Sequence, residues 1–176
     1  MLRHLPNAIT ASRGVAGIAV AALLQSSHPR WALIAFSAAM LTDLVDGALA
    51  RALNAEGELG KWLDPISDKA LTNITWLGLW LAGWVSPWIV GLLWLRDAIT
   101  GVVYTNAHRR GRTFAVNHAG RVAVSMEATA LGILLFHGPW LNVQWQSVGS
   151  VVAWVCIGLN IIAAVQYIRT GPDADA

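Results

Sequence analysis

The chain has 176 residues, of which 56% are hydrophobic and only 12% are charged. A soluble domain would carry about twice that charged fraction, so the composition excludes an ordinary soluble enzyme and indicates an integral membrane protein. The formal net charge of +2 gives no reason to expect a nucleic-acid partner, because membrane topology accounts for the basic residues.

Apolar residues lie in long runs, and a run of about 20 such residues matches a hydrocarbon core about 30 Å thick. The connections are short and leave no room for a separate soluble domain, so we expect a single domain over residues 1–176. The sequence predicts an all-α membrane protein with six transmembrane helices, over Ala8–Gln25, Trp31–Ala52, Leu59–Gly83, Pro87–His108, Asn117–His137 and Gln146–Arg169.

The first run resembles a signal peptide, because Arg3 precedes an apolar stretch. Arg13 interrupts that stretch. We therefore expect the segment to be retained as the first span.

Basic residues lie mostly at one end of the predicted bundle: near the N-terminus, on either side of the 52–60 connection, in and beside the 109–117 connection, and at the end of the last span. By the positive-inside rule, both termini and these connections face the cytoplasm. We expect the membrane to be a bacterial inner membrane. We expect Trp76, Trp80 and Trp154 to pack or to contact lipid. Five tryptophans fit this orientation by lying near the predicted outer boundary: Trp31, Trp84, Trp88, Trp140 and Trp145.

Four aspartates flank the connection between the second and third runs. Asp43 and Asp46 are three residues apart, and Asp64 and Asp68 are four apart, so on helices each pair shares one face. Both pairs lie at or near the cytoplasmic ends of their spans. We therefore expect an active site where two adjacent helices point four carboxylates at a common spot.

Carboxylates inside a membrane span are costly and indicate a functional site. Four of them together repel one another unless cations are bound. Hard divalent cations prefer oxygen ligands, and the segment contains neither Cys nor His, so we expect Mg²⁺ or Mn²⁺ rather than zinc. Two ions about 4 Å apart would suit phosphoryl transfer, where they hold the attacking and leaving oxygens.

Small residues beside the aspartates leave room for a substrate. Gly47 and Ala50 open a groove for a planar base or a pyrophosphate, and Gly60 clears one face of the next helix. Arg51 can contact a phosphate oxygen. These features predict a nucleotide-diphosphate donor site. The simpler alternative is that the aspartates only form ion pairs, at a solvated helix end, with Arg51, Lys61 and Lys69.

This segment resembles the signature of the CDP-alcohol phosphatidyltransferase family in the order Asp43-x2-Asp46-Gly47-x2-Ala50-Arg51-x8-Gly60-x3-Asp64-x3-Asp68. The six-helix layout extends the resemblance over nearly the whole chain. It implies a CDP-diacylglycerol donor or another CDP-linked donor, a divalent metal, release of CMP, and a homodimer.

By position, the resemblance implies that Asp43, Asp46 and Asp64 are metal ligands. Asp68 would be both a ligand and the general base for the acceptor hydroxyl. Around the donor, the resemblance implies a cytidine site lined by Gly47 and Ala50 and a phosphate contact from Arg51.

The acceptor is suggested by segments 6–13 and 63–69, which resemble those of phosphatidylglycerophosphate synthases and related single-motif cardiolipin synthases. Glycerol 3-phosphate would need a cytoplasmic basic pocket, which Arg110, Arg112 and Arg121 could supply. Phosphatidylglycerophosphate synthases commonly show Gly-Lys-x-Lys-Thr where this chain reads Gly120-Arg121-Val122-Ala123-Val124. Loss of the second basic residue keeps phosphatidylglycerol, the cardiolipin synthase acceptor, as an alternative.

Other polar residues fall inside the predicted spans. Neighbouring residues on a helix do not face each other, so we expect Arg96 and Asp97 to have separate partners. For these two and for Glu127 we expect structural support rather than acceptor binding. Cys156 is the only cysteine, which excludes an intrachain disulfide, and we expect it in the core. Close helix contact and dimerisation could use Gly78, Gly83, Gly91 and Gly101.

A cation transporter is the alternative from another functional class, since intramembrane carboxylates also mark cation pathways. A transporter would spread its acids across the membrane depth or place them near the midplane beside broken helices. The four motif aspartates instead cluster toward one face, which favours an enzyme.

Overall fold

The structure, a computed structural model, describes residues 5–52, 58–109, 118–136 and 143–170. For helix residues 5–12, 43–52, 58–68, 103–104, 106–109, 118–121 and 163–170 it describes the backbone alone. Nearly all of this described chain is α-helical and none of it is a strand, which confirms the all-α prediction. The helices are α1 (Leu5–Gln25), α2 (Pro29–Ala52), α3 (Glu58–Leu81), α4 (Pro87–Arg109), α5 (His118–Leu135) and α6 (Trp145–Thr170).

Each helix coincides with one of the six predicted apolar runs, and the ends differ by only a few residues. Two helices, α2 and α4, begin at Pro29 and Pro87. Proline suits this position because its fixed φ is already helical and its missing N–H would have no partner in the first turn. The prolines therefore mark these helix starts in the sequence.

The turn after α3 depends on Gly83, whose φ of 75° lies in the left-handed region. The N–H of Gly83 donates to the carbonyl of Trp80 (2.8 Å), and that of Trp84 donates to the carbonyl of Leu79 (2.9 Å). This pair of bonds is the Schellman ending, which satisfies the last carbonyls of a helix. Gly83 is thus used in a turn rather than in a contact between helices.

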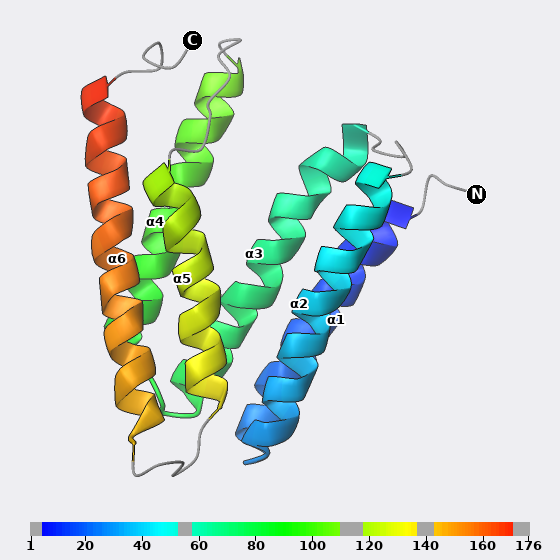
Figure 1. The fold of residues 1–176 in the computed structure, drawn as a ribbon, viewed down its shortest axis with the longest axis vertical. Helices are drawn as coiled ribbons and strands as arrows, with labels where there is room; N and C mark the ends of the chain where they lie inside the picture. The colour runs from blue at the N-terminus through cyan, green and yellow to red at the C-terminus, as the bar shows by residue number, and fades with distance from the viewer. Residues whose placement is uncertain (1–4, 53–57, 110–117, 137–142, 171–176) are drawn as a thin grey trace.

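The helices form two groups, α1–α3 and α4–α6, which lie side by side and diverge toward one end of the bundle (Figure 1). Within the first group α1 packs against both α2 and α3, and within the second α6 packs against α4 and α5. Contacts of α2 with α5, and of α3 with α4 and α5, join the groups. Helix α3 therefore touches both halves of the molecule.

Glycine allows α1 and α3 to approach closely. A Cβ atom added to Gly78 would lie 2.9 Å from the backbone Cα of Ala21, and one added to Gly17 would lie 3.1 Å from Cβ of Ile74. The expected close contact at Gly78 is thus real, but it lies within one chain. Added Cβ atoms at Gly91 and Gly101 meet no atom within 4 Å, so their use in a dimer stays a prediction.

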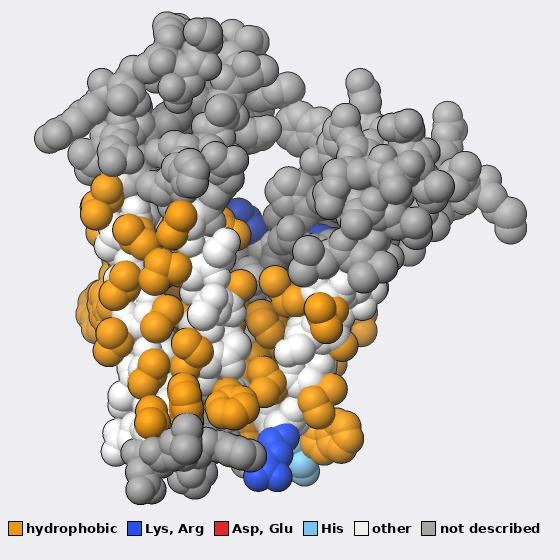
Figure 2. All heavy atoms as spheres, viewed as in Figure 1, with side chains coloured by type: hydrophobic (Ala, Val, Ile, Leu, Met, Phe, Trp, Pro, Cys, Tyr) orange, Lys and Arg blue, Asp and Glu red, His pale blue; other side chains and the backbone are white. Residues whose placement is uncertain are grey.

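Membrane-spanning character is clearest in α6. Within the described residues, the 18-residue stretch Trp145–Ile162 is long and apolar enough to cross a membrane, with a mean hydropathy of 1.5. Shorter apolar stretches occupy Arg13–Gln25 and Val122–Leu135. Figure 2 shows hydrophobic side chains along both helix groups on the face in view. Six membrane crossings stay a prediction.

Several tryptophans lie where the predicted outer boundary falls. Trp31 is near the start of α2 and Trp88 near the start of α4, and their exposed fractions are 61% and 74%. Trp84 lies in the turn before α4, and Trp145 begins α6. All four are at the end of the bundle that carries the α1–α2 and α3–α4 turns (Figure 1). Trp140 lies outside the described residues.

Candidate active site

The aspartate motif falls on two consecutive helices. The backbone of α2 carries Asp43 and Asp46, and that of α3 carries Asp64 and Asp68. Both pairs of aspartates therefore lie in helices, as expected, and their spacings of three and four residues are those of one helix face. Figure 1 shows the end of α2 and the start of α3 at the same end of the bundle. These four side chains are outside the described set, so their convergence stays a prediction.

The other predicted site residues divide between helices and connections. Gly47, Ala50 and Arg51 belong to the last turns of α2, and Gly60 belongs to the first turn of α3. In each case the structure describes only the backbone. Arg121 likewise has only its backbone described, in the first turn of α5, whereas the described residues do not include Arg110 and Arg112.

A hard divalent cation fits the donor set that the motif offers, because carboxylate oxygens are the ligands that Mg²⁺ and Mn²⁺ prefer. Elsewhere, among the side chains that the structure describes, no group of three or more His, Cys, Asp or Glu residues could hold a metal ion. Cys156 is 1% exposed, and its thiol donates a hydrogen bond to the carbonyl of Ala123 (3.2 Å). This cysteine is a core residue, as predicted.

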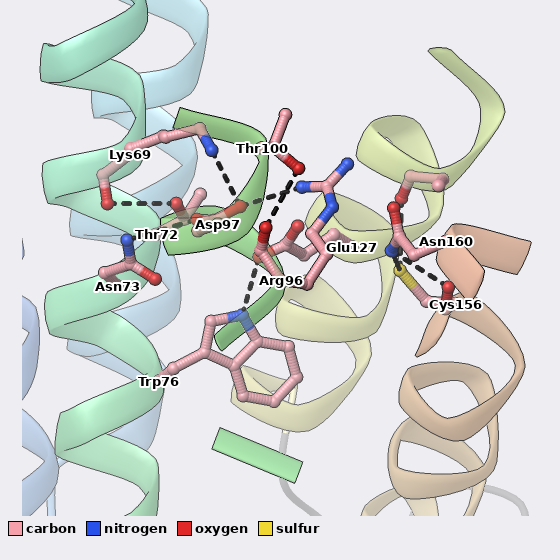
Figure 3. Close-up of polar contacts among 11 residues, drawn as sticks. Lys69, Thr72, Asn73, Trp76, Arg96, Asp97, Thr100, Glu127, Cys156 and Asn160 are labelled. Atoms are coloured by element: carbon pink, nitrogen blue, oxygen red, sulfur yellow. Dashed lines mark hydrogen bonds and ion pairs between the residues drawn. The ribbon is translucent and has the colours of Figure 1, made fainter. Parts of the chain in front are cut away.

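Immediately after the motif, α3 makes polar contacts with α4 (Figure 3). Lys69 follows Asp68 in the chain, and its Nζ lies 2.7 Å from Oδ1 of Asp97. Asn73 Nδ2 donates to the other carboxylate oxygen of Asp97 at 3.4 Å, and Arg96 Nη1 lies 2.8 Å from Oδ1. Asp97 is only 13% exposed, so these three donors replace most of the water that its carboxylate would otherwise bind.

The Arg96–Asp97 contact shows that one expectation was wrong. Neighbouring Cα–Cβ bonds on a helix point about 100° apart, which argued for separate partners. The guanidinium is carried on a long flexible side chain that folds back to the adjacent carboxylate. Asp97 does have a second partner on another helix, because it also binds Lys69.

A second polar contact joins α3 to α5. Trp76 is fully buried, and its Nε1–H donates to Oε1 of Glu127 at 3.1 Å. Glu127 is 7% exposed. Trp76 packs in the core, as one of the two predicted alternatives, but its hydrogen bond was not predicted. Trp80 and Trp154 are 40% and 47% exposed, which leaves them free to contact lipid.

Polar atoms are also buried between α5 and α6. Asn160 is 5% exposed, and its Nδ2 donates to the carbonyl of Cys156, one turn earlier, at 2.9 Å. Within the described residues, the Oδ1 atoms of Asn160 and Asn73 are buried without a hydrogen-bond partner.

Sequence reasoning missed the residues that α3 presents to α4 and α5. Lys69, Asn73 and Trp76 recur at i, i+4 and i+7, which is the spacing of one helix face. A polar or amphipathic residue at each of these positions, inside an otherwise apolar run, was the signal that could have identified this face.

Comparison with known proteins gives the family. The family model for CDP-alcohol phosphatidyltransferase matches residues 3–164. The chain is 32% identical over 140 residues to a "Probable phosphatidylglycerophosphate synthase" of Mycobacterium tuberculosis (strain ATCC 25618 / H37Rv), covering 78% of this chain and 63% of the relative. It therefore spans 63% of the length of that mycobacterial protein.

Two further relatives are each named "CDP-diacylglycerol--glycerol-3-phosphate 3-phosphatidyltransferase". The protein of Bacillus subtilis (strain 168) is 29% identical over 135 residues, which cover 76% of this chain and 69% of the relative. The protein of Rickettsia bellii (strain RML369-C) is 27% identical over 171 residues, which cover 94% of each chain. Because the family match extends over most of its length, this chain belongs to the CDP-alcohol phosphatidyltransferase family.

Proposed function

We propose that this protein transfers a phosphatidyl group from CDP-diacylglycerol to an alcohol acceptor, in a metal-dependent reaction that releases CMP. The observation that carries the proposal is the eight-position aspartate motif, residues 43–68, on the consecutive helices α2 and α3. Family membership supports the same reaction and favours it over cation transport.

The proposed chemistry is a displacement at the phosphorus atom that bears the diacylglycerol. The acceptor hydroxyl oxygen attacks that phosphorus, its proton passes to the Asp68 carboxylate, and the phosphoanhydride bond to CMP breaks with its electrons on CMP. Bound Mg²⁺ or Mn²⁺ would supply neutralisation of the charge that develops on these oxygens. Asp43, Asp46 and Asp64 would hold two such ions together with Asp68, and Arg51 would bind the donor's phosphates.

A free aspartate, with a pKa near 3.9, is a weak base toward an alcohol. Proton transfer becomes feasible where the alkoxide is stabilised as it forms. Most of the catalysis would then come from positioning and from charge neutralisation, as in other phosphoryl transfers.

We place the site at the cytoplasmic surface of a bacterial inner membrane, with six helices crossing the bilayer and two chains forming a homodimer. The exposed apolar side chains of α1, α4 and α6 support membrane insertion, for example Val15, Leu95 and Ile161, which are 65%, 56% and 59% exposed. The tryptophans at the opposite end support the orientation, because indole rings favour the membrane interface.

Glycerol 3-phosphate is the acceptor we favour, because the names of two relatives include this compound. Binding its phosphate on the cytoplasmic side would be the role of Arg110, Arg112 and Arg121. Arg121 is the strongest candidate because it belongs to the first turn of α5, where helix N–H groups also favour an anion.

Phosphatidylglycerol is the second candidate acceptor, and Ala123 is the observation that favours it. Ala123 stands where phosphatidylglycerophosphate synthases commonly have their second basic residue, and it is fully buried. Its carbonyl accepts the thiol hydrogen bond of Cys156 on α6. The close packing of α5 on α6 leaves no room here for a lysine, so this chain would offer its acceptor one cation fewer.

Purified protein incubated with labelled CDP-diacylglycerol and Mg²⁺ tests the proposal, with glycerol 3-phosphate, phosphatidylglycerol or no acceptor added. We expect CMP and labelled phosphatidylglycerophosphate with the first acceptor, and neither product from Asp64→Asn. Cardiolipin formed with the second acceptor would assign the alternative. No lipid product with any alcohol from a folded protein would refute the transferase.

A further inference from the structure

Three polar residues form one stripe along α3: Lys69, Asn73 and Trp76, called here the polar stripe. At 100° per residue they fall within an arc of about 60° and extend for about 10 Å along the helix axis. The first two bind Asp97 on α4 and the third binds Glu127 on α5. Figure 3 shows all three side chains extending from α3 toward these two helices.

We propose that Asp97 and Glu127 are positioning residues, which set the rotation of α3 about its axis and thereby the orientation of Asp64 and Asp68. The inference rests on the proposed function in one respect, the role of these aspartates as metal ligands. It assigns no contact with substrate to either positioning residue.

The polar stripe lies close enough to the motif for this effect. Lys69 is the residue after Asp68, so the first bond of the stripe fixes the turn that carries the proposed base. Two bonds at different heights, to two different helices, resist rotation better than a single contact would. The negative charge of Asp97 is balanced by more than Lys69, because Arg96 brings a second cation to the same carboxylate.

Small rotations matter at a metal site. A side-chain tip lies about 5–6 Å from its helix axis, so a rotation of about 20° moves it by about 2 Å. Magnesium needs oxygen ligands at about 2.0–2.1 Å in near-octahedral geometry. A rotation of that size would therefore remove a ligand from the ion.

The opposite side of α3 is held without charges. There Gly78 packs against Ala21 of α1, and its carbonyl accepts a hydrogen bond from Gln25 Nε2 (3.2 Å). Apart from that one neutral hydrogen bond, the contact depends on shape, and it lies ten residues along the chain from Asp68, at the far end of α3. The polar stripe, by contrast, carries directional bonds and begins at Lys69, one residue after the motif.

Mn²⁺ affinity, measured by electron paramagnetic resonance on the full-length purified protein without substrate, tests the inference. Lys69→Met and Asp97→Asn should each weaken Mn²⁺ binding about tenfold, as is typical when a residue that orients a metal ligand is changed. The double variant should be no weaker than the worse single variant, because both changes break the same bond. Lys69→Arg, which keeps the charge, should bind Mn²⁺ nearly as the unmodified protein does.

Two further variants distinguish a local effect on the metal site from a general loss of folding. Trp76→Phe keeps the aromatic ring and removes the donor to Glu127. It should weaken Mn²⁺ binding about threefold, less than the tenfold or more typical of residues that orient a metal ligand directly, because Trp76 lies farther from the motif than Lys69 does. Gln146→Met is the matched control: it removes a hydrogen bond from α6 to the turn between α3 and α4, from Gln146 Nε2 to the carbonyl of Trp84 (2.7 Å), at the far end of the bundle. It should lower the unfolding temperature and leave Mn²⁺ affinity unchanged.

The turnover assay separates this inference from the proposed function. Asp97→Asn should lower kcat about 10- to 100-fold with little change in the acceptor KM. A rise in acceptor KM alone would show that Lys69 and Arg96 bind the acceptor, and would overturn the positioning role. So would unchanged Mn²⁺ affinity in folded Lys69→Met, or a parent protein that binds no Mn²⁺. A parent that binds Mn²⁺ without releasing CMP would contradict only the proposed function.

Discussion

Helix α3 is held on its two sides by different physical means. Toward α1 the contact is mainly one of shape, since Gly78 lets the two backbones approach, and a single neutral hydrogen bond from Gln25 is added to it. Toward α4 and α5 it is polar, through bonds to Asp97 and Glu127. Shape fixes the distance between helices, whereas directional bonds also fix rotation, so we expect the first side to govern stability and the second to govern metal geometry.

The largest expected effect comes from the motif itself. Asp68→Asn should lower CMP release by about 10²- to 10⁴-fold, because the acceptor loses its general base, and the unfolding temperature should change little. Initial rates with CDP-diacylglycerol and the preferred acceptor measure it. Asp173→Asn, outside the motif, is the matched control and should be fully active. Normal turnover in Asp68→Asn would refute the base assignment.

Gly78→Ala should disrupt the close contact between α3 and α1. Its added methyl would meet the backbone Cα of Ala21, which cannot move as a side chain can, so we expect destabilisation by about 1–3 kcal/mol. The same change at Gly91, where the methyl meets nothing within 4 Å, should stabilise by up to about 1 kcal/mol. Thermal unfolding in detergent compares the two. Equal effects would mean that α1 and α3 do not pack as described.

Arg121→Ala tests the proposed acceptor contact on α5, the helix whose Glu127 binds the polar side of α3. We expect the acceptor KM to rise about tenfold, the loss of about one charged hydrogen bond, with the donor KM nearly unchanged. Steady-state rates at varied acceptor and at varied donor concentration give both values. Equal increases in the two KM values would argue against an acceptor pocket at this position.

The smallest effect is expected at the turn after α1, which has the same pair of crossed hydrogen bonds as the turn at Gly83. Here the left-handed position is held by Ser27, with φ of 59°. Ser27→Gly should therefore stabilise the protein by about 1 kcal/mol, and Gly83→Ala should destabilise it by a similar amount. Both are read from unfolding temperatures, and a loss of stability in Ser27→Gly would contradict this reading of the turn.

The helices could be predicted from the sequence because their limits are set locally. Apolar runs, the prolines at the starts of α2 and α4, and Gly83 after α3 are all visible in the chain. The pairing of helices could not be predicted, since the apolar runs that form α1, α2, α4 and α6 have nearly uniform faces. Nothing in them indicates that α1 packs against α3 as well as against α2.

The candidate site divides in the same way. The spacings of the aspartates, together with a family resemblance, predicted which helices carry the motif. The bonds from Lys69 and Trp76 to other helices were missed because they depend on how α3 is rotated against α4 and α5. The Arg96–Asp97 contact was missed because it depends on side-chain flexibility rather than on backbone position.

Binding of cations by the four aspartates is tested most directly by a crystal structure of the protein grown with Mn²⁺, using anomalous scattering to locate the ions. We expect two Mn²⁺ peaks about 4 Å apart between the last turns of α2 and the first turns of α3, each within bonding distance of Asp43, Asp46, Asp64 or Asp68. Peaks elsewhere, or carboxylates that diverge from one another, would contradict the proposed site.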